Sequence, residues 1–358
     1  MGILVFNFVI CLVLAYILYL GSPEEDSIKD KLYFAYALIL LVFFHGFIDP
    51  YSVPDVEIYK NVFDRLASKS IVGAFFDAED SEYGENFEVG FKLYLSIIAN
   101  VWHNIHFFLF VNSVVLCLLY LRFFKKYSPL FGISVILFIL LPFNQSLFVL
   151  RQHLSLAILL FSYEYIINQR FGKFLFVVII AMLFHTSSIV FFPVYFLYKV
   201  KSKKKLLALL FMGILVVVGI KYVLSLLSVL LAASERYGGY GEDISVGVAT
   251  KGLIMLVVLF FYCWTLKGRI LDDGINRLVF VLSLWGTLFN LIIGEAGAGR
   301  IFLSYYFVML IQIPLIIVNI ENRVLKSLFV FCTIVSFAFF SYVISADAKS
   351  LEDFSLMF

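Results

Sequence analysis

Apolar residues dominate this chain in long runs that are separated by short polar stretches. A helix that crosses a bilayer needs roughly 20 mostly apolar residues, and each of these runs approaches or reaches that length. They predict membrane-spanning helices over Ile3–Leu20, Leu32–Ile48, Ile105–Leu121, Leu130–Pro142, Val149–Ile167, Leu206–Ile220, Gly252–Leu266, Leu278–Ile293, Ile301–Ile320 and Leu328–Ser345.

The segment Phe174–Tyr198 is apolar at both ends but polar in its middle, at His185–Ser188. It forms either one long helix or two short helices in a hairpin. The basic residues decide between the two, because Lys and Arg concentrate on the cytoplasmic side of membrane proteins. Only a hairpin places the clusters around Arg122, Arg170, Lys199–Lys205, Lys267 and Arg323 on one side. We therefore predict the hairpin, both termini outside, and about twelve membrane helical segments.

Composition supports this all-α, polytopic membrane fold, since 63% of the residues are hydrophobic and only 15% are charged. Backbone polar groups in lipid must pair internally, so each span is helical. We expect a single membrane domain, residues 1–358, with extracytoplasmic loops at 49–102 and 221–250. The second loop is expected to begin with an interfacial helix. A net charge of +2 gives no indication of nucleic-acid binding.

Three arginines fall on the predicted outer side, where basic residues are rare: Arg151, Arg236 and Arg300. Arg151 and Arg300 open helices, where free N–H groups and the helix dipole favour an anion. The pattern indicates a phosphate or carboxylate site. The alternative is simple snorkelling to the interface, or pairing with carboxylates such as Glu295, Asp55 or Glu88.

All five histidines fall near predicted outer helix ends, and His185 lies at the tip of the hairpin beside hydroxyl side chains. His185, Asp55 and Glu88 are the candidate general bases. The acidic run Asp77–Glu88 is expected to be mainly a solvated face. His103 and His106 lie three residues apart, but nothing completes a ligand set, so no metal site and no cofactor is predicted.

The order of these motifs resembles the EpsG family of bacterial Wzy-like polysaccharide polymerases. The residues that carry the resemblance are Asp55-x₃-Tyr59, Glu88-x-Gly90-Phe91, Arg151-Gln152-x₃-Leu156-Ala157, Ala181-x₂-Phe184-His185-x-Ser187, Arg236-Tyr237 and Arg300-x₄-Tyr305. One departure is His153 with Ser155, where we expect more apolar residues.

The resemblance implies a metal-independent glycosyltransferase of the bacterial cytoplasmic (inner) membrane, acting on its outer face. Its donor and acceptor would be oligosaccharide repeat units carried on undecaprenyl diphosphate, joined into O-antigen, capsule or exopolysaccharide. A chain-length regulator is an expected partner. Arg151 and Arg300, assisted by Arg236, would hold the diphosphate, because the planar guanidinium pairs with phosphate oxygens in two places. Tyr59, Gln152, Tyr237 and Tyr305 are the candidate substrate-binding residues.

Two alternatives remain open. A flippase for the same lipid-linked sugars would show internal repeats and charges near the midplane of the bilayer, whereas here the polar residues gather at one face. An O-antigen ligase shares the substrate and the arginines, and the sequence separates it poorly from a polymerase.

Overall fold

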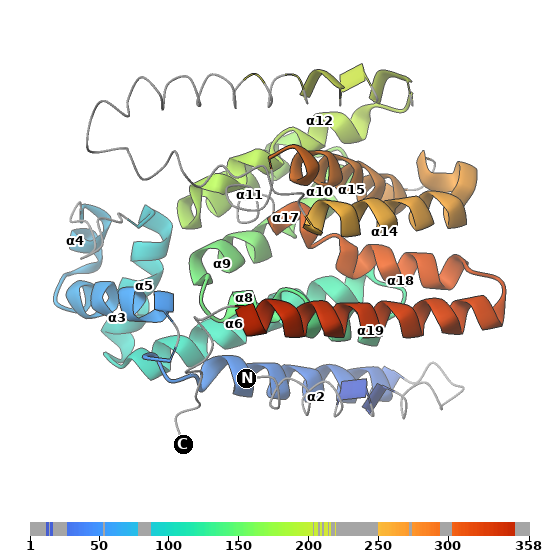
Figure 1. The fold of residues 1–358 in the computed structure, drawn as a ribbon. Helices are drawn as coiled ribbons and strands as arrows, with labels where there is room; N and C mark the ends of the chain where they lie inside the picture. Colours follow the sequence, from blue (N-terminus) through green and yellow to red (C-terminus); the bar gives the residue numbers. More distant parts are fainter. Residues whose placement is uncertain are drawn as a thin grey trace. The chain divides into compact units, whose positions relative to one another are not determined.

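The computed structural model describes residues 27–52, 54–77, 87–202, 250–271, 274–293 and 303–347. It also describes some of the residues within 12–16 and some within 204–219. These residues form helices joined by short loops (Figure 1). They fall into two compact units. The first comprises residues 1–158, 180–186 and 321–358, and the second comprises residues 159–179 and 187–320. The predicted spans Ile3–Leu20 and Leu206–Ile220 lie largely outside the described residues.

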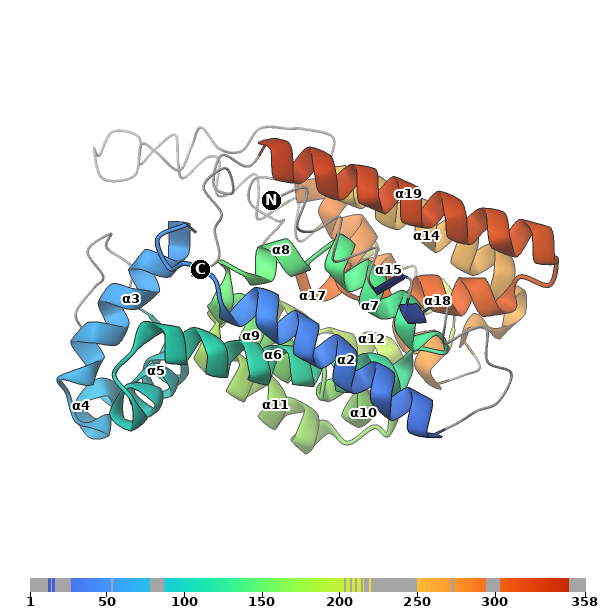
Figure 2. The same ribbon diagram turned by 90° about the horizontal axis from the view of Figure 1, so that it is seen from below.

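The first unit is built on two long antiparallel helices, α2 (Ser27–Gly46) and α6 (Ile105–Tyr127), which pack along each other (Figure 2). Gly46 makes the close approach possible, because a Cβ there would lie 2.7 Å from Ser113 Oγ and 3.2 Å from Phe110 Cα. The bundle also contains α7, α8, α9 and α19, which span Phe131–Leu140, Phe143–Ser146, Leu150–Leu159 and Arg323–Asp347.

The predicted outer loop 49–102 contains three helices: α3 (Pro54–Ala67), α4 (Ile71–Phe75) and α5 (Val89–Val101). They gather beside the beginning of α6 (Figure 1). Along α3 the buried side chains of Tyr59 and Phe63 lie on one face, one turn apart, as their spacing predicts.

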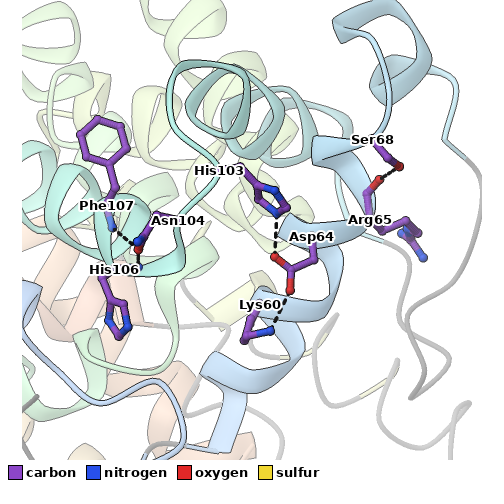
Figure 3. A network of polar contacts seen from close by, with 8 residues as sticks. All are labelled: Lys60, Asp64, Arg65, Ser68, His103, Asn104, His106 and Phe107. Carbon is purple, nitrogen blue, oxygen red and sulfur yellow. Dashed lines mark hydrogen bonds and ion pairs between the residues drawn. The ribbon is translucent and has the colours of Figure 1, made fainter.

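Ion pairs connect α3 to the segments that follow α4 and precede α6. Asp64 on α3 accepts from Lys60 Nζ at 2.7 Å and contacts His103 Nε2, just before α6, at 2.9 Å (Figure 3). Asp77, two residues after α4, is buried and pairs with Arg65 at 3.3 Å and Lys69 at 3.5 Å. The prediction of a solvated acidic face is therefore wrong at Asp77. Arg65 on α3 and Lys69, just after α3, place their positive charges against its buried carboxylate.

Hydropathy overestimated the length of two helices. The predicted span Val149–Ile167 breaks at Leu160 into α9 and α10 (Ser162–Ile167), and Ile301–Ile320 contains α17 (Leu303–Tyr306) and α18 (Met309–Asn319). The residues at both breaks are as apolar as their neighbours, so hydropathy could not reveal them. By length and composition, three of the described helices could cross a membrane, namely Ile105–Tyr127, Gly252–Leu271 and Gly274–Leu291. Shorter apolar helices cover Lys31–Gly46, Val89–Val101, Phe131–Leu140, Phe171–Phe184 and Leu303–Asn319.

The predicted hairpin is confirmed. Helix α11 (Phe171–Phe184) ends before His185, and a 3₁₀ turn, η1 (Thr186–Phe191), leads into α12 (Val194–Lys199). The rings of Phe171 and Phe174 each lie 5.1 Å from Tyr195, and the Tyr195 hydroxyl donates to the carbonyl of Gln169 at 2.8 Å. Because the start of α12 lies beside the start of α11, the chain reverses within this segment.

The rest of the second unit packs around α14 (Thr250–Leu266) and α15 (Gly274–Ile293), which form an antiparallel pair joined by the short helix η3 (Lys267–Leu271). Arg277 is buried at the start of α15, where its guanidinium donates to the carbonyl of Leu271. Ser283 donates to Gln312 Oε1 at 2.7 Å and so joins α15 to α18.

Candidate active site around Glu88

The carboxylate of Glu88 brings together residues from three separate stretches of the chain. Glu88 Oε2 accepts from Arg151 Nη1 at 3.0 Å, and Glu88 Oε1 lies 3.1 Å from His185 Nδ1. Glu88 Oε1 also accepts from the backbone N–H of Thr186 at 3.1 Å. Arg151 belongs to α9, and His185 directly follows α11. Three of the residues that the sequence singled out therefore form one connected cluster within the first unit.

The sequence around Glu88 explains why its carboxylate can reach both partners. Glu88 is the N-cap of α5, with extended backbone angles of φ −62° and ψ 144°. Two residues later, a Cβ on Gly90 would lie 2.7 Å from the carbonyl oxygen and 2.8 Å from Cβ of Leu183. Only glycine lets the first turn of α5 approach the last turn of α11 so closely. The spacing Glu88-x-Gly90 thus positions the carboxylate beside His185.

Aromatic rings support Arg151 on a second side. The Phe87 ring centroid lies 4.2 Å from Arg151 Cζ, within the range of a cation–π contact. Tyr59 packs against Phe87 and Phe91, with both centroid distances at 5.6 Å, and its hydroxyl is hydrogen-bonded to Arg151. The guanidinium is therefore held by a carboxylate, a phenol and a ring face. Such a fixed orientation suits the recognition of a phosphate group.

The electrostatics favour an ionised carboxylate at Glu88. Burial alone would raise its pKa, but the hydrogen bond from His185, the charge of Arg151 and the N–H of Thr186 outweigh burial. Together they lower the pKa of Glu88 from 4.5 to about 2. The side chains are 12% exposed at Glu88, 16% at Arg151 and 26% at His185, so the cluster is largely shielded from solvent, with His185 its most open member.

The comparison with known proteins agrees with the motif order. The sequence model of the EpsG family matches residues 31–355, which is most of the chain. The protein belongs to the EpsG family. The family comprises Wzy-like, polymerase-type membrane proteins, which makes this chain a membrane protein of polysaccharide biosynthesis. No curated protein and no solved structure matches it significantly.

The structure places the other predicted site residues of this EpsG-family protein as follows. Asp55 lies on α3, one turn before Tyr59, and Gln152 is buried beside Arg151 on α9. Tyr305, on α17 of the second unit, is fully buried; its hydroxyl donates to the carbonyl of Val190. Arg236, Tyr237 and Arg300 lie outside the described residues.

Sequence reasoning missed the contacts that hold α9 in place. Ser155 Oγ donates to the carbonyl of Ala181 on α11 at 2.7 Å. The Tyr120 hydroxyl, from α6, lies 2.9 Å from His153 Nδ1 and donates to the His153 carbonyl at 3.0 Å. His153 and Ser155 occupy positions where the resemblance to the family leads us to expect apolar side chains. This departure was the feature of the sequence that could have indicated the contacts of α9. Ser155 links the helix that carries Arg151 to the helix that ends at His185.

The described residues contain no group of three or more His, Cys, Asp or Glu side chains that could hold a metal ion. Among the same residues the cysteines Cys117, Cys263 and Cys332 are free thiols. His103 and His106 do not act together: His103 pairs with Asp64, while His106 lies in the first turn of α6 (Figure 3).

Proposed function

We propose that this protein is a Wzy-type polymerase: a metal-independent glycosyltransferase that joins oligosaccharide repeat units carried on undecaprenyl diphosphate. The reaction would take place on the extracytoplasmic face of the bacterial cytoplasmic membrane. The observation that carries the proposal is the Glu88 carboxylate, which links a shielded arginine, Arg151, to a histidine, His185. A cation site and a candidate base are thereby held side by side.

Arg151 is the proposed contact for the donor diphosphate. In the structure its charge is balanced by Glu88 at 3.0 Å. A diphosphate carries more negative charge than one carboxylate and offers several oxygens to the planar guanidinium. The donor would therefore replace Glu88 on Arg151. Arg300 and Arg236, by the sequence prediction, would complete the same anion site.

His185 is the proposed general base. Its Nδ1 lies against the Glu88 carboxylate, which can only accept, so the proton of the neutral ring resides on Nδ1. Nε2 then carries the lone pair that can take a proton. The arrangement is the one by which a carboxylate orients a catalytic histidine in hydrolases. Glu88 is thus a positioning residue for His185 as well as the counter-ion of Arg151.

The transfer can be written with these groups. The acceptor hydroxyl gives its proton to His185 Nε2 while its oxygen forms a bond to the anomeric carbon of the donor. The bond from that carbon to the diphosphate oxygen breaks, and the electron pair leaves with the lipid diphosphate. Arg151 stabilises the negative charge that develops there. Asp55, Tyr59 and Gln152 are the proposed contacts for sugars, together with Tyr237 by the sequence prediction.

The test is complementation of a deletion strain, followed by gel analysis of the surface glycan. Arg151→Ala and His185→Ala should abolish long chains while the protein still accumulates in the membrane. Arg170→Ala, an exposed arginine outside the cluster, is the matched control and should leave the ladder unchanged. Normal ladders with Arg151→Ala would refute the assignment.

The same gel separates the polymerase from the ligase. A deletion strain that still caps its lipid acceptor with single repeat units has lost a polymerase. A strain that lacks every cap has lost a ligase. Accumulation of repeat units on the cytoplasmic side would instead indicate a flippase.

A further inference from the structure

The interior of the first unit holds polar side chains away from the Glu88 cluster. His45 on α2, Asn112 on α6 and His153 on α9 are each completely buried. Within the part of the chain that the structure describes, His45 Nδ1, His153 Nε2 and both side-chain polar atoms of Asn112 have no hydrogen-bond partner. Buried polar atoms are nearly always paired in proteins, so unpaired atoms on three neighbouring helices indicate a ligand.

A chain of contacts connects the two histidines. His45 Nε2 lies 2.9 Å from the carbonyl of Ser146, and its ring lies 6.1 Å from the ring of Phe143. Phe143 contacts Phe138 at 5.7 Å, and Phe138 contacts Tyr120 at 5.0 Å. Tyr120 in turn is hydrogen-bonded to His153. Both imidazoles therefore border the same core of α6, α7 and α8.

Asn112 belongs to this region by its place on α6. It lies eight residues, a little more than two turns, before Tyr120 on the same helix. The last turn of α2, which carries His45, contacts α6 at the adjacent Ser113, where Gly46 allows the close approach. The three side chains thus come from helices that pack directly together.

The chemistry of the unpaired atoms specifies the ligand. A carbonyl only accepts, so His45 Nε2 donates to Ser146, and Nδ1 of the neutral ring is an acceptor. The Asn112 amide offers both donors and an acceptor, and none of the three side chains is a carboxylate or a permanent cation. A ligand that donates and accepts, is neutral and is small enough for a closed interior meets these demands. We propose that His45, Asn112 and His153 bind ordered water inside the bundle.

Such water would join α2, α6 and α9 where direct side-chain bonds do not. A buried water typically makes about three hydrogen bonds and is costly to remove. The site is separate from the proposed chemistry at Glu88, but it stabilises α9 and therefore the helix that carries Arg151.

Thiol reactivity tests the proposal in the full-length protein in nanodiscs. The reactive species is the thiolate, and its formation requires hydration. Asn112→Cys is prepared with Cys11, Cys263 and Cys332 changed to Ser and Cys117→Ala, and treated with methyl methanethiosulfonate. The matched control keeps Cys117, a fully buried residue on the same helix, as the single thiol. We expect Asn112→Cys to react at least about tenfold faster than Cys117.

Equal or slower modification of Asn112→Cys would overturn the water site. If that variant does not fold, His153→Cys is prepared in the same background and is likewise expected to react at least about tenfold faster than Cys117. A cryo-EM map of the unmodified protein provides a test without substitutions. Density within hydrogen-bonding distance of His45 Nδ1 supports the site, whereas a direct contact between His45 and Asn112 with no density beside them overturns it.

Discussion

Replacing Glu88 by Gln separates its two proposed roles, because the amide keeps the shape of the side chain but removes the charge. The fall in the pKa of Glu88 from 4.5 to about 2 corresponds to about 3 kcal/mol in favour of the ionised form. Glu88→Gln also leaves Arg151, only 16% exposed, without its counter-ion. We therefore expect Glu88→Gln to lower the free energy of unfolding by about 3 kcal/mol at neutral pH.

The same substitution should strengthen anion binding. In the unmodified protein a diphosphate must replace Glu88 on Arg151, and in Glu88→Gln that competing charge is gone. If half of the 3 kcal/mol reappears as affinity, the dissociation constant for inorganic pyrophosphate falls about tenfold. Polymerisation should nevertheless drop, because His185 loses the carboxylate that orients it. Tighter pyrophosphate binding together with lost activity is a combination that simple misfolding cannot produce.

The assay is thermal unfolding of the protein in nanodiscs over a pyrophosphate titration, with chain synthesis measured on the same preparations. Glu57→Gln, an exposed carboxylate in the first turn of α3, is the matched control. It should change neither the transition temperature nor the affinity. Weaker or unchanged pyrophosphate binding by Glu88→Gln would refute the view that Glu88 occupies the anion site.

The pH dependence of stability offers an independent check of the same pair. A carboxyl whose pKa is depressed in the folded state contributes its stabilisation above the unfolded pKa and loses it as pH falls through the folded value. For Glu88 this places the loss between pH 4.5 and about 2. The difference in stability between the unmodified protein and Glu88→Gln should therefore shrink across that window, and a constant difference would contradict the pairing.

Three further substitutions test the packing around the site, each by thermal unfolding in nanodiscs. Gly90→Ala should destabilise the protein by about 1–3 kcal/mol through its clash with α11, whereas Gly172→Ala, with no atom within 4 Å of the new Cβ, should be neutral or stabilising. Ser155→Ala should cost about 1 kcal/mol and reduce polymerisation, since α9 loses its link to α11. Asp77→Asn should cost about 3 kcal/mol because two cations enclose that buried carboxylate. An equal effect from Asp64→Asn, whose side chain is 41% exposed, would contradict this distinction, since solvent-accessible pairs contribute about 1 kcal/mol or less.

The sequence was informative where charge or helical period constrained the chain. The distribution of Lys and Arg predicted the hairpin, and the ring contacts of Phe171 and Phe174 with Tyr195 confirm it. The breaks at Leu160 and before Met309 were not predictable, because the residues at the breaks, Leu160 with Phe161 and Phe307 with Val308, are themselves apolar. Hydropathy reports the affinity of a segment for lipid and carries no information on where its backbone turns.

The candidate site, like the fold, could be predicted from the sequence only in part. Sequence reasoning selected Glu88, Arg151 and His185 separately, and pairing of Arg151 with Glu88 stood as one explanation among others. It could not show that one carboxylate contacts both partners, because that depends on how closely α5 approaches α11. Gly90 was visible as part of a motif, but its role follows only from the position of Leu183.

The shared carboxylate also bears on how the proposed anion site works. A partly buried arginine without a counter-ion would be costly in the ligand-free protein. Glu88 removes that cost, and because it also bonds His185 and the N–H of Thr186, it keeps partners after it leaves Arg151. Donor binding would then exchange one anion for another on Arg151 while Glu88 stays beside His185. The anion site and the base would thus share a single side chain, since Glu88 Oε2 gives way to the diphosphate on Arg151 while Glu88 Oε1 keeps its contact with His185.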